Sequence, residues 1–117
     1  MMANKESYLG EFEHVVMLSI LSLKDNAYGV TIRHNLKEKV GREVAIGALY
    51  STAERLENKG LLSSKKGEAV SERGGKAKRY FSVTPLGMSA LNVTKKQLET
   101  LWSQASVNFS IQGGRKT

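Results

Sequence analysis

Basic side chains gather between residues 65 and 79, where they outnumber acidic ones by four. The six basic residues are Lys65, Lys66, Arg73, Lys76, Lys78 and Arg79, and the two acidic ones are Glu68 and Glu72. Gly74 and Gly75 can supply the positive φ angles of a hairpin turn between the two halves. Cationic groups on such a hairpin can follow a phosphate backbone or a groove. The segment predicts a nucleic-acid contact through Arg73, Lys76, Lys78 and Arg79, with a solvated loop of incidental charge as the simpler alternative.

A second set of residues suited to DNA lies on the polar side of residues 45–59. The small residues Gly47 and Ser51 would let a helix approach a duplex closely, and Tyr50 and Ser51 can donate to phosphate oxygens. Arg55 can contact a phosphate or bind a guanine edge through two hydrogen bonds. Two structural alternatives stay open: the Tyr50 ring could pack against the preceding helix, and Arg55 could form a surface salt bridge.

Other chemistries find no support in the sequence pattern. The chain has no cysteine, which removes disulfides, thiolate metal sites and cysteine nucleophiles together. Its two histidines, His14 and His34, are not at ligand spacing, so no metal site is expected. Gly75-Lys76 is followed by Ala77 rather than Ser or Thr, which argues against a phosphate-binding P-loop. We expect no catalytic residue, no cofactor and no enzyme activity.

The overall composition is that of one small basic domain. The 117 residues carry 18 Lys and Arg against 11 Asp and Glu, a formal net charge of +7, and 40% of them are hydrophobic. A surplus of this size suggests a polyanionic partner, although a basic surface can also serve solubility alone. The first residues lack the apolar run of a signal peptide, and no segment approaches the ~18 apolar residues of a membrane span. We expect a cytoplasmic protein without a membrane contact.

Hydrophobic periodicity predicts the elements that would position these residues. Apolar residues at spacings of three and four indicate helices, Phe81 and Val83 alternate as in a half-buried strand, and Thr84-Pro85 is a strong helix start. Three helices, a hairpin and a long helix form a mostly α fold with a small antiparallel β-hairpin, the winged helix-turn-helix. We expect a DNA-binding domain at residues 9–84 and a dimerisation helix at 85–112. The expected helices are 11–23, 28–40, 45–59 and 85–109, and the expected strands are 61–66 and 77–83.

The two outer helices carry more apolar residues than one small domain can cover. The first helix has almost no polar face, and a helix that is apolar all round must be covered on more than one side. Leu91, Leu98 and Ala105 lie seven residues apart in the last helix, which is typical of a short coiled-coil seam. A second copy of the chain would cover both helices. The expected dimer contacts are Phe12, Val16, Leu91, Leu98, Leu101, Trp102 and Ala105.

These segments, in this order, resemble the PadR family of transcriptional regulators over roughly residues 9 to 102. The resemblance is carried by Leu9-Gly10-Glu11-Phe12-Glu13, Asp25-Asn26-Ala27-Tyr28-Gly29, Ile46-Gly47-Ala48-Leu49-Tyr50, Arg55-Leu56-Glu57-Asn58-Lys59-Gly60-Leu61-Leu62-Ser63, Arg73-Gly74-Gly75-Lys76-Ala77-Lys78-Arg79-Tyr80-Phe81 and Val83-Thr84-Pro85-Leu86-Gly87. It implies a dimeric winged-helix repressor of the short form, with one C-terminal dimerisation helix. Some short members bind planar aromatic compounds between tryptophans of the paired C-terminal helices, which makes Trp102 the candidate effector residue. Ala53 departs from the family, which usually has a large apolar residue there.

The sequence thus predicts a homodimeric transcriptional regulator, in particular a repressor, that binds an inverted-repeat operator in double-stranded DNA. An aromatic small molecule is the candidate effector. Two alternatives stay open: a winged helix that docks a partner protein, and a module whose main trait is a ligand pocket between the C-terminal helices.

Overall fold

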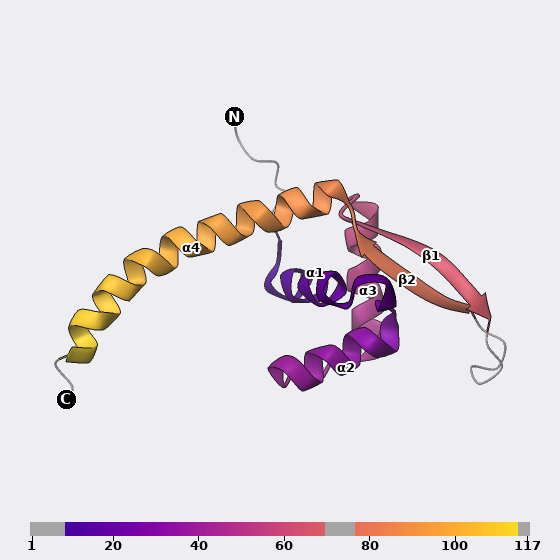
Figure 1. Cartoon of the computed structure of the whole chain (residues 1–117), viewed down its shortest axis with the longest axis horizontal. Helices are drawn as coiled ribbons and strands as arrows, with labels where there is room; N and C mark the ends of the chain where they lie inside the picture. Colours follow the sequence, from indigo (N-terminus) through magenta and orange to yellow (C-terminus); the bar gives the residue numbers. More distant parts are fainter. Residues whose placement is uncertain (1–8, 70–76, 115–117) are drawn as a thin grey trace.

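The chain forms a small helical body from which a β-hairpin and a long helix extend in different directions (Figure 1). The computed structural model describes the backbone of residues 9–69 and 77–114 and the side chains of residues 9–67 and 78–106. This order confirms the predicted winged helix-turn-helix with a long C-terminal helix. The elements are α1 (Glu11–Leu23), the 3-10 turn η2 (Lys24–Asn26), α2 (Gly29–Val40), α3 (Ile46–Asn58), β1 (Leu62–Ala69), β2 (Ala77–Val83) and α4 (Pro85–Gly114).

The core lies where α1, α2 and α3 meet the base of the hairpin. Its largest fully buried side chains are Met17, Ile20, Ile32, Leu49, Leu56, Leu62 and Val16. In α3, Leu49 and Leu56 lie seven residues, or two turns, apart, and in α1 Ile20 lies three and four residues after Met17 and Val16, so each of these helices buries one side. Ala53 is also buried in this cluster, with Tyr50 half-buried beside it. Ala53 is therefore packed within the core, although it is smaller than the residue that the family usually has there.

Two apolar residues that periodicity places on the inward side of a helix face solvent instead. Ile46 stands three residues before the buried Leu49, but its side chain is 41% exposed because it lies in the first turn of α3, at the edge of the core. Val40 continues the four-residue spacing of Ile32 and Leu36, and it is exposed at the last residue of α2. The end of a helix can project beyond the helix that packs against it, and periodicity alone does not show where that packing ends.

The two strands pair antiparallel as expected, with a longer first strand than predicted. Leu62 pairs with Val83, and Lys65 pairs with Tyr80. The predicted span of 61–66 was wrong at both ends: Leu61 accepts a hydrogen bond from Thr84 before β1 begins, and pairing continues to Ala69 after an irregularity beyond Lys66. The predicted turn at Gly74-Gly75 lies outside the described residues.

Thr84 fixes the start of α4, as its position before a proline predicted. Its Oγ1 accepts a hydrogen bond from the Gly87 amide at 3.0 Å and donates one to the Gly60 carbonyl at 2.6 Å. Gly60 ends the third helical segment with φ +80°, in the left-handed region where glycine is favoured. One threonine therefore joins the beginning of α4 to the end of the segment that carries α3.

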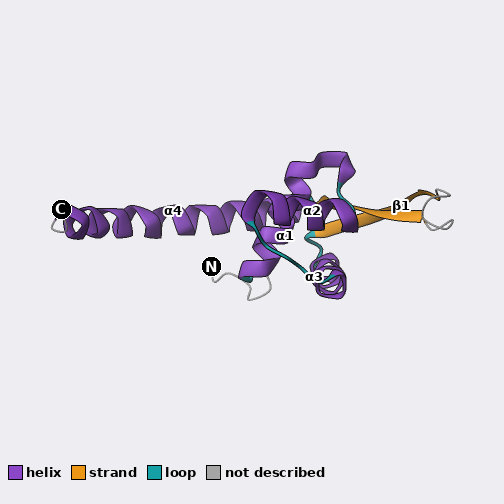
Figure 2. Cartoon of the chain, turned by 90° about the horizontal axis from the view of Figure 1, so that it is seen from below, coloured by secondary structure: helices purple, strands orange, loops and turns teal. Residues whose placement is uncertain are grey.

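Helix α4 is longer than predicted and leaves the body of the protein. It continues to Gly114, whereas the sequence placed its end near Phe109 and a frayed tail from Gly113. Figure 2 shows α4 and the hairpin extending in opposite directions from the body that α1, α2 and α3 form. The radius of gyration is 17.5 Å, compared with about 13 Å for a compact domain of this length. Within the described residues, no helix is long and apolar enough to cross a membrane.

Candidate nucleic-acid interface

The first turns of α3 present small and apolar groups to solvent. Ile46, Gly47, Ala48 and Ser51 are exposed, and a Cβ added at Gly47 would meet no atom within 4 Å. The structure thus confirms that Gly47 and Ser51 lie on an open face, as the sequence predicted. Such a face can approach a major groove closely, and its methyl groups suit the C5 methyl of thymine. We call this exposed set, Ile46 to Ser51 without the inward Leu49 and Tyr50, the reading face.

Tyr50 lies beside the reading face and holds it against the body. Its ring packs at 6.3 Å from the Phe81 ring, and a Cβ on Gly29 would lie 3.0 Å from its Cζ and overlap its hydroxyl oxygen. The packing alternative for Tyr50 is therefore confirmed. The glycine at the start of α2 is needed so that the two helices can approach this closely.

Arg55 forms a salt bridge within the protein, as the structural alternative predicted, and its DNA contact stays a prediction. Its Nε donates to Glu13 Oε2 at 3.1 Å, and its Nη2 lies 3.5 Å from Thr52 Oγ1. The partner is a carboxylate of α1, not one of the neighbours on α3. The side chain of Arg55 is still about half exposed, so one part of the guanidinium faces solvent.

Glu13 joins α1 to Arg55 and Lys59, a contact that the sequence did not predict. It is only 6% exposed, and its carboxylate accepts from Arg55 Nε, Lys59 Nζ and the Gly10 amide. Burial alone would raise the pKa of Glu13, but these three hydrogen bonds outweigh burial and hold the pKa below its ordinary value. The available signal was a carboxylate close before the apolar run of residues 15–18, because a charge that becomes buried requires partners.

Arg79 of the hairpin is likewise paired inside the chain. Its Nη2 bonds to Glu57 Oε1 of α3, its Nε donates to Ser64 Oγ at 3.0 Å, and its guanidinium lies 5.2 Å from the Phe81 ring centroid. Glu57 also accepts from Ser64 Oγ at 2.7 Å. Arg79 therefore links the hairpin to α3, and its DNA contact stays a prediction.

The remaining cations of the hairpin differ in their availability. Lys78 Nζ lies 4.4 Å from the Tyr28 ring centroid and 3.4 Å from its hydroxyl, so this lysine is partly occupied. Lys65 and Lys66 are exposed, and among the described side chains no carboxylate pairs with them. They belong to the basic segment but not to its four predicted DNA contacts. The predicted contacts Arg73 and Lys76 lie outside the described residues.

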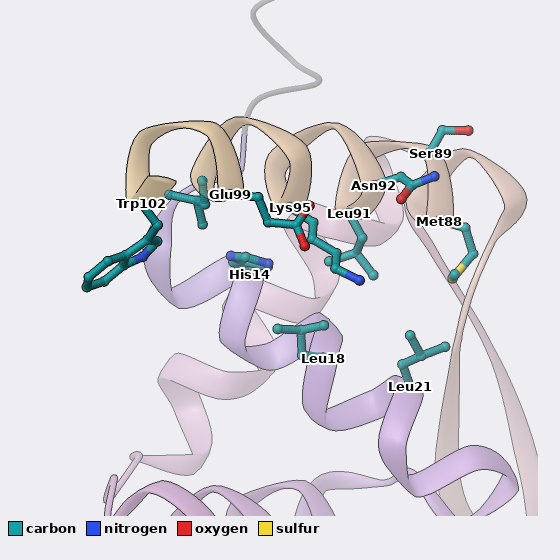
Figure 3. A pocket seen from close by; sticks show the side chains of 11 residues that line it. His14, Leu18, Leu21, Met88, Ser89, Leu91, Asn92, Lys95, Glu99 and Trp102 are labelled. Carbon is teal, nitrogen blue, oxygen red and sulfur yellow. The ribbon is translucent and has the colours of Figure 1, made fainter. Parts of the chain in front are cut away.

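A groove of about 850 Å³ runs between α1 and α4 on the side away from the core (Figure 3). His14, Leu18 and Leu21 of α1 face Leu91, Lys95 and Trp102 of α4 across it. Trp102 lies at one end and is 68% exposed. Most of the lining is apolar, which leaves a large unpaired hydrophobic surface on this side of the chain.

The structure divides the predicted dimer contacts into exposed and buried residues. Leu98, Leu101, Trp102 and Ala105 are exposed on α4. Val16 is 0% exposed and Leu91 is nearly buried, because both belong to the core of the single chain. Val16 therefore has no surface to offer a partner, and its inclusion was wrong. Phe12 is half-buried, with the Arg42 guanidinium 5.2 Å from its ring centroid.

Several known proteins are similar to this chain in sequence and in fold. The model of the PadR-like family of transcriptional regulators matches residues 17–93, well over half of the chain. A PadR-like transcription factor from Bacteroides fragilis is 28% identical, with a TM-score of 0.71 over 81% of this chain and 86% of that one. A PadR family regulator from Eggerthella lenta is 27% identical, with a TM-score of 0.65 over 85% and 86%.

A PadR family regulator from Clostridium difficile is 22% identical, with a TM-score of 0.67 over 84% of this chain and 98% of that chain, and this likeness concerns the fold. No curated protein sequence matches the chain at a significant level. The family match covers the core helices, the hairpin and the start of α4, which are the elements that form and position the reading face. The chain therefore belongs to the PadR-like family of transcriptional regulators, which are DNA-binding proteins.

Proposed function

We propose that the protein is a cytoplasmic homodimeric repressor that binds an inverted-repeat operator and is released by a small-molecule effector. The dimer is supported by the apolar side of α4, where Leu98, Leu101 and Trp102 are exposed on a helix that extends away from the rest of the protein. A second copy related by a twofold axis would cover each groove with the partner's α4. A bound dimer would repress by covering DNA that the transcription machinery needs.

Each protomer would place its reading face in a major groove. In a twofold dimer the two grooves lie about 34 Å apart, one helical turn of DNA, so the two half-sites are inverted repeats. The hairpin lies beside α3 and would follow the flanking phosphates with Lys65 and Lys66. Because Arg55 and Arg79 are already paired with carboxylates, the free charge of the interface lies mainly on the hairpin lysines.

Selection of bound duplexes from a random DNA pool tests this function. We expect an inverted repeat with half-sites about 10 base pairs apart, centre to centre. We also expect affinity to fall steeply between about 50 and about 200 mM salt, because phosphate neutralisation releases counterions. No enriched sequence, together with an affinity for a protein partner that salt hardly changes, would instead support a protein-docking winged helix.

The groove between α1 and α4 supports effector binding. We infer a planar aromatic ligand, because the lining is mostly apolar and Trp102 offers an exposed indole face at one end. Titration with aromatic cations should quench the Trp102 fluorescence, and Trp102 is the only tryptophan, so the signal has one source. Trp102→Leu should keep the apolar groove and weaken binding of the same compounds, measured by calorimetry. Unchanged fluorescence across a broad panel of aromatic compounds would contradict this role.

A further inference from the structure

Helix α3 and the residue after it are bound to α1 at two points by a single carboxylate. Glu13 Oε2 accepts from Arg55 Nε and from Lys59 Nζ, each at 3.1 Å. Its other oxygen, Oε1, accepts from the Gly10 amide at 2.8 Å, at the start of α1. The carboxylate thus joins the beginning of α1 to the last turns of α3.

Arg55 lies in the last turn of α3, and Lys59 is the residue directly after the helix, four positions later, so the two cations lie on the same side about one turn apart. Contacts at two successive turns restrict both rotation about the helix axis and sliding along it. The reading face lies on the same helix, about one to two and a half turns before Arg55. A helix of 13 residues behaves as a short rod, so a rotation at Arg55 and Lys59 would turn Gly47 and Ser51 by the same angle.

Water has little access to the Glu13 carboxylate. The Glu13 side chain is 8% exposed, and that of Lys59 is 24% exposed. Removing the charge would leave Lys59 and part of Arg55 without their partner, which is the costly outcome for a buried ion pair. The neighbouring pair between Glu11 and Arg42 is different, because it joins α1 to the loop before α3 and both side chains reach solvent.

We propose that Glu13 is a positioning residue that sets the orientation of α3 through Arg55 and Lys59, and so determines how well the protein distinguishes its operator from other DNA. It does not touch DNA itself. The proposal rests on the proposed function in one respect, namely that α3 reads the operator. In this arrangement Arg55 and Lys59 hold α3 in place within the protein, and the hairpin cations supply most of the attraction to any DNA.

Glu13→Gln tests the proposal, with Glu11→Gln as the matched control. Both changes remove one negative charge from the first turn of α1, but only Glu13 contacts α3. We expect Glu13→Gln to lower the ratio of operator to random-DNA affinity about 10-fold, the effect of losing one correct base contact. Affinity for random DNA should stay equal or rise slightly, since the net charge becomes more positive. Glu11→Gln should leave the ratio unchanged.

A double-mutant cycle shows whether Glu13 acts through the two cations. In a background with Arg55→Gln and Lys59→Gln, adding Glu13→Gln should change the ratio no further. Additive losses would overturn the proposal, and so would an unchanged ratio in Glu13→Gln. Should Glu13→Gln fail to fold, Lys59→Gln alone should still lower the ratio, and an unchanged ratio there counts against the proposal. A wild-type protein without any sequence preference would contradict the proposed function instead.

Discussion

Gly87→Ala is expected to lower the free energy of unfolding by about 3 kcal/mol. A Cβ at this position would overlap the Leu61 carbonyl oxygen and would lie 2.8 Å from Val83 Cγ1. The carbonyl belongs to the backbone and already accepts a hydrogen bond from Thr84, so it cannot move aside without breaking the start of α4. Urea denaturation followed by circular dichroism measures the effect, which corresponds to a fall of roughly 12 to 24 °C in the melting temperature.

Gly47→Ala is the matched control for this prediction. It makes the same substitution near the start of a helix, but a Cβ there meets nothing within 4 Å. We expect this variant to be as stable as the wild type or more stable by up to about 1 kcal/mol, because alanine favours the helix. Equal stability of the two variants would show that α4 does not pack against Leu61 as described.

Leu101→Glu is expected to weaken the dimer by about 10²–10⁴-fold. Leu101 is 64% exposed in the single chain, and burying a leucine stabilises an interface by about 1.5–3 kcal/mol. A twofold dimer contains this residue twice, so the loss is doubled, and each 1.4 kcal/mol changes the dissociation constant tenfold. Analytical ultracentrifugation measures the change. Affinity for the inverted repeat should fall with it, whereas affinity for a single half-site should stay the same.

Ser103→Glu controls for the added charge. At 3.6 residues per turn, Ser103 lies about 160° around α4 from Leu101, and it is exposed. We expect this variant to dimerise and to bind the inverted repeat as the wild type does. A dimer that resists Leu101→Glu would show that another surface joins the protomers.

The order of elements could be predicted from local pattern alone. Apolar spacing identified the helices, and Thr84 before Pro85 marked the start of α4, because the signals that begin and end helices act within one or two turns. The basic hairpin was also visible, since charge is a property of composition. The ends of β1 and α4 were misplaced because pairing partners and helix fraying are not encoded by periodicity.

The partners of the charged side chains depended on the fold. Arg55 pairs with a carboxylate 42 residues earlier in the chain, and Arg79 with one 22 residues earlier. The sequence predicted a DNA contact for each arginine and left a surface salt bridge open for Arg55. It could not name the partner, because hydrophobic periodicity indicates which side of a helix faces solvent but not which neighbouring element lies there. Val16 shows the same limit on the apolar side, where the core of the single chain covers it before a partner can.

By itself, then, the sequence determined the winged-helix class, the basic hairpin and the small residues of the reading face, since these follow from local propensity and composition. Only the tertiary structure decided which cations remain available to DNA and which apolar residues remain available to a second copy. The physical reason is that availability is set by neighbours distant in sequence, such as Glu13 beside Arg55 and Lys59.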